Sequence, residues 1–340
     1  MSGPLHNAFA PLTIPASWVY RSAVQWRNRR FDAGRGIEPL PVPVISIGNI
    51  TTGGTGKTPL TAWLAELLRS QGHQPAIAMR GYGARPGMPS DEAMEYAERL
   101  PDVPLIVDAD RARACKAHCA AHPQTDCILL DDGFQHRRVR RDLDLVLIDA
   151  TADTFRQRLL PAGHLREPLA NLARADAVIV TRAGTAPDAN LAALIEQYHG
   201  QAPIAWTRHT WVNLRRIDRS GESTLPISWI KGKKLVTLLG VGNPNAVLRD
   251  VEAAGATVAA NIPAGDHERF SAAKLRVAQG LCDGLDGLFM TAKDWARSRS
   301  VLDLSSWRTP IIVPQLNVEF IAGRDAVEAC LRPALLSHQS

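Results

Sequence analysis

The sequence predicts an α/β protein in which helices cover both faces of a parallel sheet and a second, smaller α/β domain follows. Short apolar runs recur in the first half of the chain without polar alternation, as in strands that are buried on both faces. Helical or loop stretches separate these runs, as the crossovers between parallel strands require. With 340 residues, of which 45% are hydrophobic and 21% charged, the chain is long enough to fill two cores.

An amphipathic segment, residues 1–31, comes first. Pro15 suits the first turn of a helix, where its missing N–H costs nothing. Trp18 and Trp26 recur at helical spacing among arginines, a combination typical of helices that lie at a lipid surface. The same spacing also fits a helix packed on its own domain. The segment is therefore predicted to be helical and membrane-associating, with domain packing as the alternative.

The first domain is expected to span residues 32–217. Its first strand is PVPVISIGN, and the helix PLTAWLAELLRSQG follows and ends at Gly72. Further buried strands are predicted at PAIAM, VPLIV, CILLDD, LDLVLIDA and DAVIVT. The strand-like PIAWTRHTW precedes the polar stretch Asp218–Thr224, where we place the domain boundary.

The second domain, residues 218–340, is expected to alternate strands and helices again. It begins with the strand KKLVTLLGVG and the helix NPNAVLRDVEAAG, and the helix RDAVEACLRPALL closes it. Because ligand sites favour the space between domains, this domain is expected to complete an active-site cleft.

The composition narrows the range of partners. The chain has 39 Lys and Arg against 34 Asp and Glu, and a net charge of +5 is too small to indicate nucleic acid. It does suit an anionic partner or an anionic membrane surface. The five cysteines are scattered, so no disulfide framework is expected. With no signal-peptide pattern and no run near the roughly 20 apolar residues of a spanning helix, a cytosolic setting is predicted. No obligate protein partner is expected.

A glycine-rich loop between the first strand and the first helix of residues 32–217 is the strongest motif. Its backbone N–H groups and the helix N-terminus would hold phosphates, Lys57 would reach the outer phosphates, and the Thr58 hydroxyl would hold Mg²⁺. Thr51 stands where the usual pattern has its first glycine. The loop predicts a P-loop NTPase-type fold. Its candidate nucleotide-binding residues are Thr52, Gly53, Gly54, Thr55, Gly56, Lys57 and Thr58.

A pair of carboxylates, Asp131 and Asp132, ends the strand CILLDD. Parallel strands bring their carboxyl ends to one edge of the sheet, so this pair is expected near the phosphate loop. Carboxylate and hydroxyl oxygens are ligands that Mg²⁺ prefers, which makes Thr58, Asp131 and Asp132 the predicted metal ligands. A solvated turn after a strand is the alternative.

The nucleotide is predicted to be ATP. A GTPase carries an Asn/Thr-Lys-x-Asp element after a late strand, and the nearest candidate, Thr291-Ala292-Lys293-Asp294, has its lysine one place late. The stretch Arg182-Ala183-Gly184 after DAVIVT offers no carboxylate either.

These motifs, with several others in fixed order, resemble those of the tetraacyldisaccharide 4′-kinases, the lipid A 4′-kinases. The resemblance runs from about residue 14 to about residue 330. It rests on SIGNITTGGTGKTP (Ser46–Pro59), RGYG (Arg80–Gly83), LDDGFQHRRVRRDLDLVLID (Leu130–Asp149), LLPAGHLREP (Leu159–Pro168), RADAVIVTR, GVGNP (Gly240–Pro244), DHERF (Asp266–Phe270) and TAKD (Thr291–Asp294).

The resemblance implies a two-domain kinase that transfers the γ-phosphate of ATP, with Mg²⁺, to the 4′-hydroxyl of a tetraacylated disaccharide 1-phosphate in lipid A biosynthesis. It also implies a peripheral enzyme on the cytoplasmic face of the inner membrane, where residues 1–31 would lie among lipids. Two alternatives remain from the residues alone. One is a P-loop kinase of a soluble small molecule, and the other is a nucleotide-switched assembly ATPase.

The resemblance further implies roles for individual residues. Asp91 would accept the proton of the sugar hydroxyl, a contribution of about 10²–10⁴-fold, and His267 would orient it. These two residues fall in different predicted domains, so the pair would form only as the cleft closes. Lys57 is the third catalytic candidate.

The acceptor's polar head is expected to meet residues of two motifs. The candidates are Arg80 and Tyr82 of RGYG, and Gln135 and His136 of the stretch that follows Asp132. The arginines of HRRVRRD (His136–Asp142) are further candidates, because the guanidinium fork matches phosphate, with a solvated turn as the alternative.

Four positions depart from the family's pattern. Ser90 stands where the family has glycine before its aspartate, and Glu268 where it has a second histidine. Ala292 replaces the usual glutamate, and His164 the usual proline.

Overall fold

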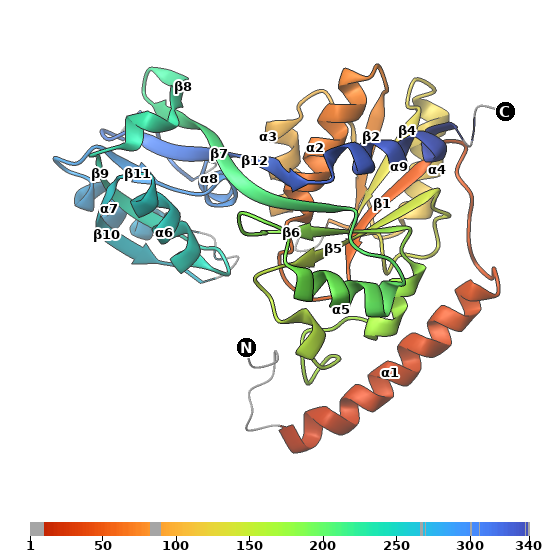
Figure 1. The fold of residues 1–340 in the computed structure, drawn as a ribbon. Coiled ribbons are helices and arrows are strands. Elements are labelled where there is room, and N and C mark those ends of the chain that lie inside the picture. Colours follow the sequence, from red (N-terminus) through yellow and green to blue (C-terminus); the bar gives the residue numbers. More distant parts are fainter. Residues whose placement is uncertain are drawn as a thin grey trace. The chain divides into compact units, whose positions relative to one another are not determined.

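The structure, a computed structural model, describes residues 10–81, 90–265, 268, 270–299, 301–305, 307–336 and 338. The chain forms two compact units (Figure 1). Unit 1 comprises residues 1–82, 96–209 and 318–340, and unit 2 comprises residues 83–95 and 210–317. This division differs from the expected boundaries at 31/32 and 217/218, because the chain returns to unit 1 after residue 317.

Unit 1 is built on a parallel sheet whose strand order is β7-β6-β5-β1-β4-β2-β3. Every predicted run of residues 32–181 forms a strand, and five of the six strands are buried along their whole length. The strands are β1 (Val44–Asn49), β2 (Pro75–Met79), β3 (Leu105–Val107), β4 (Cys127–Asp131), β5 (Leu143–Asp149) and β6 (Ala177–Thr181). The predicted parallel sheet is therefore confirmed.

Helices cover both faces of this sheet. The helix α2 (Lys57–Ser70) lies against β1, β2 and β4, while α4 (Arg111–Ala121) lies against β2 and β3. Ile128 packs with Cys115 of α4, and its neighbour Leu129 points to the opposite face, as the pleat requires. The remaining elements of this unit include α5 (Ala189–His199), α9 (Arg324–Leu336) and the 3₁₀ helices η2 (Thr154–Arg156) and η3 (Leu169–Arg174).

The N-terminal helix α1 (Ala10–Asp32) begins earlier than expected. Pro15 lies inside the helix and does not open it, so that prediction was wrong. Because the N–H that proline lacks would bond only one turn from the helix start, the loss is local. None of the helices in the described part of the chain is long and apolar enough to cross a membrane.

In unit 2 the strands pair in parallel in the order β10-β9-β11-β12. Helices pack on it around two hydrophobic clusters, one of which contains Phe270 and Trp295 and the other Val251 and Phe289. The elements are η4 (Ile227–Ile230), β9 (Lys234–Leu239), α6 (Pro244–Ala253), β10 (Thr257–Pro263), α7 (Ala272–Leu281), β11 (Gly287–Phe289), α8 (Ala292–Ser298) and β12 (Ile311–Ala322).

Two further features were not predicted. The polar stretch Asp218–Thr224 is not a linker, because it contains the turn of a hairpin and the first residues of β8 (Gly221–Pro226), which pairs antiparallel with β7 (Ala205–Asp218). The Asp218 carboxylate accepts bonds from the N–H and hydroxyl of Ser220 and so closes the turn. The helix α3 (Asp91–Arg99) is divided, since its first five residues group with unit 2.

Candidate active site

The phosphate loop lies between β1 and α2, as predicted. Gly53 and Gly56 have positive φ angles of 101° and 81°, a backbone region that glycine reaches without steric cost. A Cβ atom at Gly56 would also lie 2.9 Å from the ring of His209. The loop therefore needs glycine at both positions to turn its N–H groups along one path.

Two buried polar side chains hold the loop from the core side. Asn49 Nδ2 donates to Thr55 Oγ1 at 3.0 Å, and Thr181 Oγ1 donates to the Thr55 carbonyl at 2.8 Å. Thr55 is only 4% exposed. Its side chain is committed to the core, so a nucleotide could meet Thr55 only through the backbone.

His164 contacts the loop from the segment LLPAGHLREP. The Thr52 N–H donates to the His164 carbonyl at 2.7 Å, and the Thr52 hydroxyl lies 2.9 Å from His164 Nδ1. A proline, which the family usually has here, would keep the carbonyl and lose the side-chain bond. The exchange thus adds a contact to the phosphate loop in this chain, which the sequence alone did not reveal.

Replacing His164 with alanine is expected to raise KM for ATP about fivefold, because one net hydrogen bond is worth about 1 kcal/mol. Steady-state kinetics at varied ATP measures this, with Thr52→Val expected to have the same effect and the double variant no more than either alone. His73→Ala, at an imidazole bonded to Asp126, is the matched control. Additive effects would show that the two side chains act independently.

The carboxylates Asp131 and Asp132 lie beside the loop's strand, since β1 and β4 pair with Ile47 opposite Asp131. Asp131 is buried and accepts from the Tyr96 hydroxyl at 3.1 Å and from the Asp132 N–H at 2.9 Å. The Asp132 side chain is 39% exposed and has a left-handed φ of 49°. The structure therefore offers one orienting carboxylate and one accessible carboxylate.

Two cations flank Asp132. Lys57 Nζ lies 3.3 Å from Asp132 Oδ1, and Arg166 Nη1 lies 2.7 Å from Oδ2. Burial by itself raises the pKa of Asp132, but Lys57 and Arg166 together outweigh it and hold that pKa below its usual value. The structure thus brings the predicted Lys57 and Asp132 together, and adds Arg166 of the Leu-Arg-Glu-Pro motif, which had no assigned role.

The donor set fits Mg²⁺. Thr58 in the first turn of α2 supplies a hydroxyl, and Asp131 and Asp132 supply carboxylates at the end of the neighbouring strand. Mg²⁺ coordinates such oxygens and usually takes only one or two carboxylates from the protein.

The acceptor candidates are placed unequally. Gln135 Nε2 donates to the Asn49 carbonyl at 2.8 Å, and Gln135 Oε1 accepts from Arg166 at 3.3 Å, so Gln135 belongs to the phosphate-loop edge. Burial, with Arg111, Arg141 and Arg138 nearby, lowers the pKa of His136 to about 3. His136 is therefore neutral at physiological pH. Arg80 is exposed, and Tyr82 lies outside the described residues.

Asp91 does not lie in the domain where the sequence placed it. It groups with unit 2, where its carboxylate pairs with Arg297. Ser90 caps α3, because its hydroxyl accepts from the Ala93 N–H at 3.2 Å, which explains a serine at this position. Asp266 and His267 lie outside the described residues. Glu268 pairs with Lys274 at 2.6 Å.

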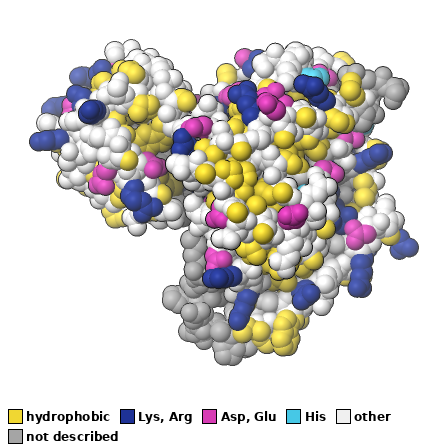
Figure 2. All heavy atoms as spheres, in the orientation of Figure 1, with side chains coloured by type: hydrophobic (Ala, Val, Ile, Leu, Met, Phe, Trp, Pro, Cys, Tyr) yellow, Lys and Arg dark blue, Asp and Glu magenta, His cyan; other side chains and the backbone are white. Residues whose placement is uncertain are grey.

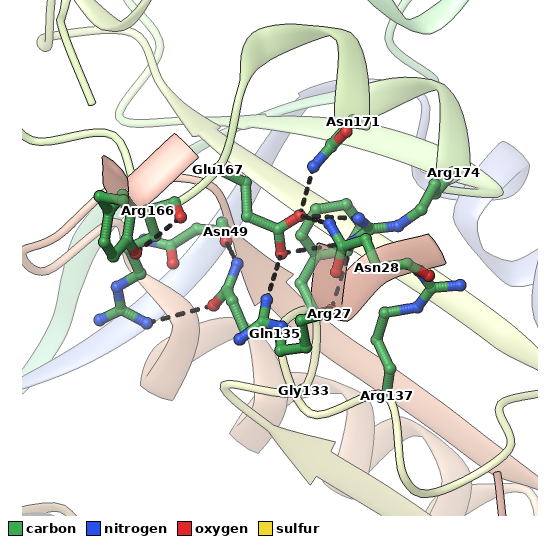
Figure 3. Close-up of polar contacts among 12 residues, drawn as sticks. Arg27, Asn28, Asn49, Gly133, Gln135, Arg137, Arg166, Glu167, Asn171 and Arg174 are labelled. Atoms are coloured by element: carbon green, nitrogen blue, oxygen red, sulfur yellow. Dashed lines mark hydrogen bonds and ion pairs between the residues drawn. The ribbon is translucent and has the colours of Figure 1, made fainter. Parts of the chain in front are cut away.

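Glu167, which follows Arg166, joins α1 to the rest of unit 1. Its side chain is fully buried and accepts from Arg174 at 2.7 Å, Asn171 at 2.6 Å and Asn28 of α1 at 3.0 Å (Figure 3). Tyr20 of α1 donates to the Arg166 carbonyl at 2.9 Å. The Leu-Arg-Glu-Pro motif therefore contacts the carboxylate site and the N-terminal helix at once.

A strand, a glycine loop, a helix and a carboxylate pair beside a lysine define a P-loop nucleotide-binding protein. A family model described as tetraacyldisaccharide-1-P 4'-kinase matches residues 9–335. The chain therefore belongs to the tetraacyldisaccharide 4′-kinase family, as its motifs indicated, and is an ATP-dependent kinase of lipid A biosynthesis.

Relatives and a solved structure agree with this assignment. The tetraacyldisaccharide 4'-kinase of Ectopseudomonas mendocina (strain ymp) is 38% identical over 316 residues, which cover 89% of this chain and 88% of that protein. The same enzyme of Pseudomonas putida (strain W619) is 39% identical over 308 residues, covering 87% and 85%. The crystal structure of LpxK from Aquifex aeolicus in complex with ATP has a TM-score of 0.73 at 24% identity, covering 95% of this chain and 98% of that one. That likeness confirms the α/β fold class.

Proposed function

We propose that the chain transfers the γ-phosphate of ATP to the 4′-hydroxyl of tetraacyldisaccharide 1-phosphate at the inner-membrane surface, with Asp91 as the base. The cluster of Lys57, Asp132 and Arg166 beside a phosphate loop carries the phosphoryl-transfer part of the proposal. Family membership favours the acceptor.

The residues of unit 1 supply positioning and charge. Phosphoryl transfer spreads negative charge over the transferred group, and the loop N–H groups, Lys57 and Arg166 would stabilise that charge. Mg²⁺, held by Thr58, Asp131 and Asp132, would neutralise charge on the phosphates. The more accessible Asp132 is suited to touch the metal. Asp131 is suited to orient Asp132, because its carboxylate accepts from the Asp132 N–H. Gln135 would hold Arg166 in place.

A sugar hydroxyl attacks well only when its proton has an acceptor. Asp91, in the first turn of α3, supplies a carboxylate for that step. Because the base belongs to unit 2 and the phosphate loop to unit 1, transfer would depend on both units.

Membrane association rests on the two faces of α1. Thr13, Ser17, Val24 and Asn28 are buried against unit 1. On the other face Trp18 is 68% and Trp26 64% exposed. Figure 2 shows Lys and Arg side chains (dark blue) along the edge where α1 lies. Exposed tryptophans beside cations suit an anionic lipid interface, so packing of α1 on its own domain is compatible with the proposed lipid contact.

A basic cavity extends this surface. It is lined by Phe31 and by side chains that share a positive charge, namely Arg27, Arg30, Arg35 and Arg138. Such a cavity suits the phosphate of a lipid headgroup.

Replacing Trp18 or Trp26 with alanine is expected to weaken binding to anionic vesicles about 10–100-fold each, because burying a large apolar side chain is worth roughly 1.5–3 kcal/mol. Vesicle sedimentation at fixed salt measures this. Val277→Ala, at a residue that is 58% exposed on unit 2, should leave binding unchanged. Equal binding by all variants would exclude insertion of the tryptophans.

Transfer of labelled γ-phosphate from ATP tests the function as a whole. The acceptors are detergent-solubilised tetraacyldisaccharide 1-phosphate and the same disaccharide 1-phosphate without acyl chains. Labelling of the acylated compound at its 4′ position is expected, and the deacylated one should be a poor substrate. Efficient labelling of the deacylated compound alone would favour a soluble-substrate kinase. Slow ATP hydrolysis without labelling of either would favour a switch ATPase.

A further inference from the structure

Two motifs of unit 2, GVGNP and TAKD, meet at a buried carboxylate. Asp294 is fully buried, and its Oδ1 accepts from the Gly240 N–H at 3.0 Å. Its Oδ2 accepts from the Thr291 hydroxyl at 2.7 Å, and that hydroxyl caps α8 by accepting from the Asp294 N–H. A Cβ atom at Gly240 would lie 3.1 Å from Asp294 Oδ1, tighter than ordinary contact, so glycine suits this position. These motifs form one hydrogen-bonded cluster at the start of α8.

The cluster holds a second buried charge, Arg297. Its side chain is 1% exposed, and Nη1 donates to the Gly240 carbonyl at 2.9 Å and lies 3.6 Å from Asp294. Its Nε lies 2.8 Å from Asp91 Oδ2 in an ion pair. The guanidinium is therefore fixed on one side by Gly240 and Asp294 and presents the other side to Asp91.

A second pair repeats this arrangement one turn away. Lys293 Nζ lies 4.0 Å from Glu95 Oε2. Asp91 and Glu95 are four residues apart on α3, so these two carboxylates lie on one face of that helix. Lys293 and Arg297 are four residues apart on α8 and likewise share a face. All four residues belong to unit 2. The start of α3 is thus held against α8 by two charge pairs. The Arg297 pair is the shorter, with the arginine 1% and Asp91 17% exposed.

We infer that Arg297 is a positioning residue for Asp91, and that GVGNP and TAKD serve to hold it there. The inference rests on the proposed role of Asp91 as the base. Arginine stays protonated in proteins, so Arg297 cannot exchange the proton itself. It occupies Asp91 Oδ2 and fixes the direction of the carboxylate toward a hydroxyl. A base misplaced by about 1 Å costs about 10²-fold in rate.

The test compares single and double variants in the labelled-phosphate assay. Arg297→Gln is expected to lower kcat about 10–100-fold with KM for ATP unchanged, and Arg297→Lys to recover much of the loss because it keeps the charge. Asp91→Asn/Arg297→Gln should be no slower than Asp91→Asn, since residues that act through one another are not additive. Arg299→Gln, at an exposed arginine that ends the same helix, is the matched control and should behave as wild type.

Each alternative result has a distinct meaning. Equal fold losses from Arg297→Gln in the wild-type and Asp91→Asn backgrounds would overturn the inference, as would a rise in KM for ATP with kcat unchanged. If Arg297→Gln fails to fold, the cycle with Arg297→Lys decides by the same criterion. Asp91→Asn with full activity would instead refute the proposed base. A slow Asp91→Asn with a fully active Arg297→Gln would refute only the positioning role.

Discussion

Replacing Asp91 with asparagine is expected to lower kcat for phosphate transfer about 10²–10⁴-fold, the usual contribution of a positioned general base. Asparagine keeps the size of the side chain and its place in the first turn of α3, but it cannot accept the proton of the sugar hydroxyl. The measurement is kcat with saturating ATP and acylated acceptor, for both proteins at one pH. The KM for ATP should stay unchanged, because the residues of the phosphate loop belong to unit 1.

The control for this prediction is the neighbouring carboxylate. Glu92 lies in the same first turn of α3, so Glu92→Gln removes an equal charge next to Asp91. It should retain nearly full activity. A similar loss of kcat in both variants would show that the negative charge at the start of α3 matters, and not a base at Asp91. Normal transfer by Asp91→Asn would show that another residue is the base.

Replacing Glu167 with alanine is expected to lower the free energy of unfolding by about 3–5 kcal/mol, the cost of removing one partner from a buried ion pair. Arg174 would lose its carboxylate, and Asn28 and Asn171 would lose an acceptor. Burial raises the pKa of Glu167, but Arg174, Asn171 and Asn28 outweigh burial and hold that pKa below the ordinary 4.5. The stabilisation that ionised Glu167 gives to the folded state is therefore complete above pH 4.5. It is lost as the pH falls through the lowered pKa of Glu167.

Denaturant unfolding at neutral and acid pH measures this difference. The matched control is Glu319→Ala, since Glu319 also binds an arginine, Arg208, through both oxygens but at the surface. Exposed pairs contribute little, so the control should unfold almost like wild type. Equal losses in the two variants would show that burial of Glu167 has no special weight.

The sequence predicted the sheet of unit 1 well because fully buried parallel strands leave an unbroken apolar pattern. Every run from PVPVISIGN to DAVIVT became a strand. The division into units was harder to predict. Nothing in the local pattern of β12 indicates that its end returns to unit 1. That return depends on a contact between residues far apart in the sequence: the ring centroids of Phe320 and Trp63 lie 4.6 Å apart.

The candidate site shows the same limit. Lys57 and Asp132 were predictable because their roles follow from strand–loop–helix order. Arg166 and His164 come from a segment more than 100 residues after the loop, and only the fold reveals their contacts. Ser90 could have been recognised, since serine before acidic residues at a helix start is a capping signal. Arg297 carried no signal, because a single arginine in a helix usually faces solvent.

Unit 1 is built from separate segments of the chain, and this affects the order in which its parts are synthesised. Unit 1 is interrupted after His209 and resumes only at Val318, so all of unit 2 is synthesised before unit 1 is complete. At about 5–20 residues per second, translation of Thr210–Asn317 takes roughly 5–20 s. During that interval the surface of α2 that Phe320 covers is still uncovered. The surface on which α9 packs is uncovered as well, since Val327 and Leu331 of α9 are buried in the finished protein. Unit 1 therefore cannot complete its core until the end of β12 and the helix α9 have been synthesised.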